Sequence, residues 1–64
     1  MQIEVNDKVK IKSQLSFEDE NTYYTVTGKY YDREGNVMFE LEDEDGFLLE
    51  DVYYPSQLIK IQEG

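Results

Sequence analysis

The sequence predicts an all-β protein, and its composition, its alternation and its turns each indicate this class. The chain has 64 residues and no alanine, the residue that favours helices most, whereas its valine, isoleucine, tyrosine and phenylalanine suit a pleated, half-buried strand. Apolar and polar residues alternate over most of the chain, as in strands with one buried face. Glycine-containing turns separate the alternating segments. We therefore expect one domain that spans residues 1–64.

The first alternating segment, residues 3–12, is expected to be the first strand. Its apolar residues share one parity and its lysines the other: Ile3, Val5, Val9 and Ile11 against Lys8, Lys10 and Lys12. The next ten residues are rich in turn formers and predict a long loop, from which Leu15 and Phe17 are expected to pack back against the core.

The second and third strands are expected at residues 23–31 and 37–42. The second strand is expected to divide its side chains between two faces: Tyr24, Val26 and Tyr30 on one, and Tyr23, Thr25, Thr27, Lys29 and Tyr31 on the other. Gly28 marks a bend or bulge in it. The third strand is expected to bury Val37, Phe39 and Leu41. Gly35 and Gly46 supply the positive φ that the two following hairpin turns need.

The fourth segment, residues 47–54, breaks its alternation at Leu48 and Leu49. A bulge near Glu50 and Asp51 would keep both acids out of the core. Pro55 then suits the start of a single helical turn. The chain closes with a last strand at residues 59–61, where Ile59 and Ile61 are expected to point one way and Lys60 the other.

The order of these elements resembles an SH3-like barrel. Residues 5–12 are similar to the first strand of bacterial SH3-like, KOW-type or Tudor-type barrels, and residues 53–61 resemble the SH3 segment in which a Pro-Ser pair precedes the last strand. The resemblance implies a small five-stranded SH3-like barrel with a short 3₁₀ turn before the last strand. It does not extend to the groove that binds proline-rich peptides, because the chain has no tryptophan and Leu58 replaces a tyrosine of that groove.

The residue types argue against catalysis. The chain has no histidine and no cysteine, so it lacks the commonest general base and the best nucleophile. The acidic turn before Gly46 resembles a calcium loop only superficially, because Leu41 would stand at the first ligand position. We therefore expect no enzyme activity, no cofactor and no metal site.

The N-terminal sequence and the lack of cysteine bear on location. The first residues alternate without a continuous apolar run, so we expect neither a signal peptide nor a membrane span. A chain without cysteine is typical of a reducing compartment. We interpret the sequence as a complete cytoplasmic protein that begins at Met1.

Acidity is the most pronounced feature of the sequence. Fifteen acids against six bases give a net charge of −9. Seven of the acids fall within twelve residues that contain no lysine or arginine: Glu40, Glu42, Asp43, Glu44, Asp45, Glu50 and Asp51. A second cluster comprises Glu18, Asp19 and Glu20. Solubility alone would account for such a charge. Alternatively, the acidic surface selects a basic partner and repels nucleic acid, whose phosphates require clustered cations.

Six tyrosines and three phenylalanines are too many for a core of this size. Tyr23, Tyr31 and one of Tyr53 or Tyr54 fall at outward positions, and of the last pair we select Tyr54. Exposed tyrosines are favoured at interfaces because each offers a large rigid contact area and a hydroxyl. The alternative is that the rings pair across neighbouring strands and stiffen the sheet.

The sequence thus predicts a protein-interaction module that binds a basic surface of a protein partner. The candidate contacts are the seven clustered acids together with Tyr23, Tyr31 and Tyr54. We expect no direct binding of nucleic acid, no membrane contact, and a monomer or weak homodimer. Two alternatives stay open: a nucleic-acid mimic of the kind that phages and mobile elements use against DNA-binding host enzymes, and a structural subunit of a larger assembly.

Overall fold

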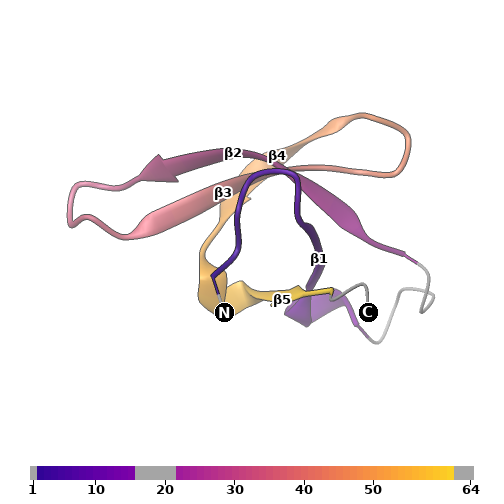
Figure 1. Ribbon diagram of the computed structural model, residues 1–64, viewed down its shortest axis with the longest axis horizontal. Helices are drawn as coiled ribbons and strands as arrows, with labels where there is room; N and C mark the ends of the chain where they lie inside the picture. The colour runs from indigo at the N-terminus through magenta and orange to yellow at the C-terminus, as the bar shows by residue number, and fades with distance from the viewer. Residues whose placement is uncertain (1, 16–21, 62–64) are drawn as a thin grey trace.

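The computed structural model describes residues 2–15 and 22–61 and confirms the all-β class. Five antiparallel strands form one sheet: β1 (Lys8–Ile11), β2 (Tyr24–Tyr31), β3 (Val37–Glu42), β4 (Leu48–Tyr53) and β5 (Leu58–Lys60). Their spatial order is β4-β3-β2-β1-β5, so β4 and β5 are the edges (Figure 1). Two 3₁₀ turns, η1 (Lys12–Gln14) and η2 (Pro55–Gln57), complete the described elements, which include no α-helix. The 3₁₀ turn expected before the last strand is therefore confirmed.

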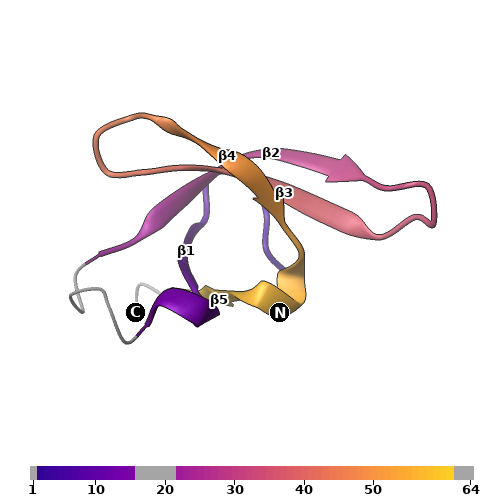
Figure 2. The ribbon, with the colours of Figure 1, turned by 180° about the vertical axis from the view of Figure 1, so that it is seen from behind.

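The sheet bends so that its two ends face one another across a small core. Strands β2, β3 and β4 lie together, and β1 leads away from them to β5 and the two 3₁₀ turns (Figures 1 and 2). Seven apolar side chains are buried: Ile3, Val9, Ile11, Val26, Phe39, Leu41 and Leu58. Because no disulfide is present to help, this cluster carries the packing that holds the fold together.

Both hairpin turns are built in the same way. Gly35 has a φ of 85° and Gly46 a φ of 87°, which confirms the positive φ expected at both. Each turn begins with an aspartate: Asp32 in the β2–β3 turn and Asp43 in the β3–β4 turn. Each aspartate's Oδ1 accepts the backbone N–H groups two and four residues further on, all at 2.9 Å. These local hydrogen bonds fix the turn independently of the rest of the sheet.

A bulge in β2 confirms the irregularity expected at Gly28 but changes which tyrosine faces outward. The register with β3 shifts between Val26 and Gly28, so Thr27 is an extra residue. Beyond it, Tyr30 lies opposite Met38 and Tyr31 lies opposite Val37. Because opposite residues share a face, Tyr30 is on the outer side and Tyr31 on the core side. The expected faces of these two tyrosines were therefore wrong, although Tyr31, at 63%, is exposed as expected and Tyr30, at 49%, is exposed as well.

A second bulge confirms the one expected near Glu50 and Asp51. Glu40 pairs with Val52 and Glu42 pairs with Leu48, so residues 49–51 of β4 lie opposite Leu41 alone. The bulge leaves Glu50 and Asp51 exposed. Leu49, within the bulge, and Tyr53, beyond it, pack against the core.

The N-terminal segment differs from the expected long strand. Asn6 adopts a φ of 80°, which asparagine tolerates better than most residues, and the chain turns there. Strand β1 therefore begins only at Lys8, and Val5 is 42% exposed instead of buried. The turn is held to β2, because the N–H of Asn6 donates to the Val26 carbonyl (2.8 Å) and the N–H of Val26 to the Asp7 carbonyl (2.9 Å).

Two further expectations concern the loop and the last strand. Leu15 is 45% exposed and does not pack against the core, whereas Phe17 lies outside the described residues. In β5, Leu58 lies opposite Ile11 and is buried, and Ile59 lies opposite Lys10 and is exposed.

Candidate interaction surface

Six of the seven clustered acids lie on the solvent side of the β3–β4 hairpin. Glu40 and Glu42 are partly buried on the outer side of β3. The other four are exposed and are called here the exposed hairpin acids: Glu44, Asp45, Glu50 and Asp51. The first two stand at the tip of the turn and the last two on the β4 bulge. The structure thus brings the acids together along one hairpin.

Asp43 has a different role from its neighbours. Its Oδ1 accepts the N–H groups of Asp45 and Phe47, each at 2.9 Å. The side chain is therefore engaged in closing the turn, and its primary contribution is to the hairpin's shape.

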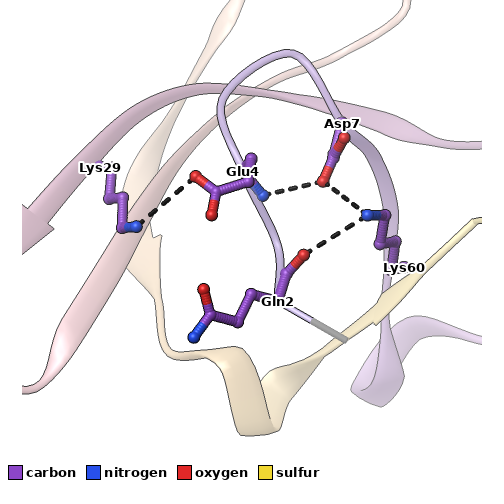
Figure 3. Close-up of polar contacts among 5 residues, drawn as sticks. All are labelled: Gln2, Glu4, Asp7, Lys29 and Lys60. Carbon is purple, nitrogen blue, oxygen red and sulfur yellow. Dashed lines mark hydrogen bonds and ion pairs between the residues drawn. The ribbon is translucent and has the colours of Figure 1, made fainter.

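Two lysines of the described residues pair with acids outside the β3–β4 hairpin. The ion pairs among residues 2–15 and 22–61 are Lys29 with Glu4 (3.6 Å) and Lys60 with Asp7 (3.1 Å), both beside the N-terminal segment (Figure 3). Neither includes an acid of residues 40–51. No acid of the hairpin is therefore in an ion pair among the described residues.

The N-terminal ion pair also stabilises its own turn. Asp7 Oδ2 accepts the N–H of Glu4 at 2.8 Å and lies beside the Lys60 ammonium, which also donates to the Gln2 carbonyl at 3.4 Å (Figure 3). The hydrogen bond from Glu4, followed by that from Lys60, holds the pKa of Asp7 below its ordinary value of 3.8. Asp7 is thus a structural carboxylate.

The three selected tyrosines are not gathered at the acidic hairpin. Tyr23 is partly buried, and the Lys8 ammonium lies 4.9 Å from its ring centroid, in a cation–π contact. Tyr31 and Tyr54 both lie near the β2–β3 turn. Tyr31 is 63% exposed, and the hydroxyl of Tyr54 donates to Asp32 Oδ2 at 3.2 Å. That hydrogen bond raises the pKa of Tyr54.

A cavity of about 580 Å³ lies beside Tyr31, between the N-terminal segment, the β2–β3 turn and η2. Its lining combines apolar residues such as Phe39 and Leu58 with the side chains of Lys29 and Lys60. Because both lysines are already paired with carboxylates, the cavity offers little free positive charge. In the described ranges, no three or more Asp, Glu, His or Cys side chains are grouped as metal ligands would be.

The sequence pattern did not place three exposed apolar residues on the outer face of the sheet: Tyr30, Leu48 and Val52. This face is the side of β2, β3 and β4 turned away from the core, and it carries Thr25, Gly28, Tyr30, Met38, Glu40, Glu42, Leu48 and Val52. Three of its apolar side chains are well exposed: Leu48 at 57%, Tyr30 at 49% and Val52 at 45%. The broken alternation at Leu48 and the glycine in β2 are the signals that could have revealed it.

The chain was compared with protein-family models, with curated proteins and with solved structures, and none of the three comparisons gives a match. Over the residues that the structure describes, no helix combines the length and the apolar character needed to cross a membrane.

Proposed function

We propose that this chain is a non-catalytic protein-interaction module that binds a basic surface of a protein partner through its β3–β4 hairpin. The observation that carries the proposal is the distribution of charge: seven acids in twelve residues, while the ion pairs of the described chain lie at the N-terminal segment. A concentrated charge of one sign attracts a complementary surface and raises the association rate.

The neighbours of the acids support a protein partner. Leu48 and Val52 are exposed directly beside Glu42 and Glu40 on the same face. An apolar side chain gains from contact with another protein's apolar groups. A cleft that binds phosphates consists of cations and N–H donors, which gain nothing from leucine or valine. The apolar neighbours therefore favour a protein-binding surface over mimicry of nucleic acid.

The strand order supports assignment of the fold as an SH3-like barrel. A chain in which β1 pairs with both β2 and β5, with a 3₁₀ turn at Pro55 just before β5, follows the arrangement that the resemblance implies. Closure would bring β4 towards β5 across the open side of the sheet. Nuclear Overhauser contacts between these two strands, measured by NMR, test the closure.

Capture from a lysate with two matched variants tests the function. The hairpin variant neutralises the exposed hairpin acids: Glu44→Gln, Asp45→Asn, Glu50→Gln and Asp51→Asn. The loop variant removes the same charge elsewhere: Glu18→Gln, Asp19→Asn, Glu20→Gln and Glu34→Gln. Proteins captured by the wild type should be retained by the loop variant and lost from the hairpin variant, because only the latter removes the proposed contact.

Two outcomes count against the proposal. Equal losses from both variants would mean that total charge alone matters, and equal retention would place the interface elsewhere. Added duplex DNA distinguishes mimicry, because only a partner held at its own nucleic-acid site would be released by it.

A further inference from the structure

The outer face has a repeating arrangement of charge and apolar surface. Side chains directly opposite one another form three rows across the strands: Leu48, Glu42 and Thr25; Val52, Glu40 and Gly28; and Met38 with Tyr30. Each of the two carboxylates on β3 therefore has an exposed apolar neighbour on β4. On a chain with a net charge of −9, solubility requires no such apolar surface.

Gly28 allows the ring of Tyr30 to lie close against the sheet. A methyl group at position 28 would stand 2.8 Å from Cε2 of Tyr30, well inside van der Waals contact. Since Gly28 lies opposite Glu40, the ring extends along the face towards that carboxylate's row. The face thus carries an aromatic surface next to an acid.

Glu40 is held in position on this face. The hydroxyl of Thr27, the extra residue of the bulge, lies 3.2 Å from Glu40 Oε1 and 3.3 Å from the Glu40 carbonyl oxygen, and it can donate to either. The other carboxylate oxygen has no partner among the described residues, and the side chain is only partly buried. It can therefore accept a hydrogen bond from outside the chain.

The chemistry of this face discriminates between occupants. A second copy of the chain would bring a further charge of −9 against it, and an anionic membrane or nucleic acid would be repelled in the same way. A basic segment is attracted. Arginine suits this face better than lysine. Its planar guanidinium can donate two hydrogen bonds to one carboxylate and can stack on an aromatic ring, and the methylenes of its side chain cover apolar residues.

We propose that the outer face is the centre of the interface, and that it binds an extended, arginine-bearing segment of the partner protein. Guanidinium groups reach Glu40 and Glu42, one of them stacks on Tyr30, and apolar side chains of the segment cover Leu48 and Val52. This inference rests on the proposed function and adds to it the residue at the centre and the type of cation. The exposed hairpin acids then act as the rim.

A titration of ¹⁵N-labelled protein with two synthetic peptides tests the inference. One is a heptapeptide with arginine, valine, arginine and valine at its odd positions and serine at its even positions, so that an extended chain presents both residue types on one face. The other replaces every arginine with lysine. Both should shift amide signals of β2, β3 and β4, and the arginine peptide should bind roughly fivefold more tightly because of its stacking and bidentate contacts. Equal affinities, or shifts confined to the tip of the β3–β4 turn, would overturn the proposal.

Matched variants locate the contact. Glu40→Gln with Glu42→Gln should abolish the preference for arginine, whereas Glu44→Gln with Asp45→Asn removes the same charge from the rim and should keep it. Leu48→Ser with Val52→Ser should weaken both peptides. The chemical shifts of the free protein show that each variant is folded. Concentration-dependent shifts of the outer face without peptide would indicate self-association and would contradict the inference.

The partner identified by capture separates this inference from the proposed function. If that partner is lost with the hairpin variant but keeps its affinity for the Leu48→Ser, Val52→Ser protein, the function stands and the outer face is not its centre. If the hairpin variant captures the same proteins as the wild type, the proposed function itself fails.

Discussion

At Gly28, the absence of a side chain determines where an aromatic ring lies. The ring of Tyr30 occupies the space beside it, at the distance where a β-carbon would collide with Cε2. Aromatic rings that cover a glycine in this way compensate for the packing that the glycine lacks. The two residues should therefore be energetically coupled.

A double-mutant cycle measures this coupling. In a Tyr30→Ala background, Gly28→Ala should stabilise the protein by about 0.5 kcal/mol, because alanine loses less backbone entropy on folding. With Tyr30 present, the same change should give less stabilisation or a loss, because the ring must move. Urea unfolding of the four proteins provides the free energies. Identical effects of Gly28→Ala in both backgrounds would show that the ring does not lie over the glycine.

Asp7 should make stability depend on pH in the acidic range. Its pKa is lowered in the folded state by the N–H of Glu4 and by Lys60, so the carboxylate is favoured by folding. A lowered folded pKa contributes stability above the unfolded value of about 3.8, and that contribution is lost as the pH falls through the folded value.

The Asp7→Asn variant isolates this contribution, because asparagine keeps an oxygen acceptor but has no charge. Thermal unfolding should show the variant less stable than the wild type at neutral pH, and the difference should shrink below a pH of about 3.8. Because the other carboxylates titrate equally in both proteins, the difference in stability between wild type and variant reports on Asp7 alone. A difference in stability that stays the same down to the lowest pH would show that the charge of Asp7 does not contribute.

At the scale of elements, the two hairpin turns depend on one glycine each. No atom outside the neighbouring residues lies within 4 Å of the position where a β-carbon would stand at Gly35 or Gly46. The cost of a side chain there is therefore backbone strain alone. Gly35→Ala should cost about 1–2 kcal/mol, and Gly35→Asn less, since asparagine tolerates positive φ. Chemical unfolding measures both, and an alanine variant as stable as the wild type would exclude the positive φ.

The strand pattern was predictable wherever the register is regular. Val37, Phe39 and Leu41 alternate without interruption, and their expected side of β3 agrees with the structure. The glycine in β2 predicted a bulge, but it did not indicate that Thr27 is the extra residue. Because side chains alternate with a period of two, that single residue decides whether Tyr30 or Tyr31 faces outward.

The candidate site was predictable only where it depends on residues that are close in the sequence. Acids that are close in the sequence remain close on a hairpin, so the acidic β3–β4 surface could be read from the chain. The role of Asp43 in its turn depends on local hydrogen bonds, and the position of Tyr54 beside the β2–β3 turn depends on its contact with Asp32, which is distant in the sequence. Alternation along a strand contains neither kind of information.

At the scale of the whole molecule, the net charge of −9 should weaken the fold through self-repulsion. Raising the salt concentration to about 0.15 M shortens the range of that repulsion to about 8 Å and should raise the melting temperature. The hairpin variant should respond less, because it has lost four of the repelling charges. Melting curves at several salt concentrations check both statements, and a wild type whose stability falls or stays constant with salt would contradict them.

The central claim is that the acidic hairpin draws a basic partner surface to this protein. Surface plasmon resonance with the captured partner tests it most directly, by measuring the association rate constant of three proteins over a range of salt concentrations. The wild type and the loop variant should associate quickly at low salt and slow down steeply as salt is added, whereas the hairpin variant should associate slowly with a flatter dependence. If all three proteins show the same rates and the same salt dependence, the hairpin does not recognise the partner.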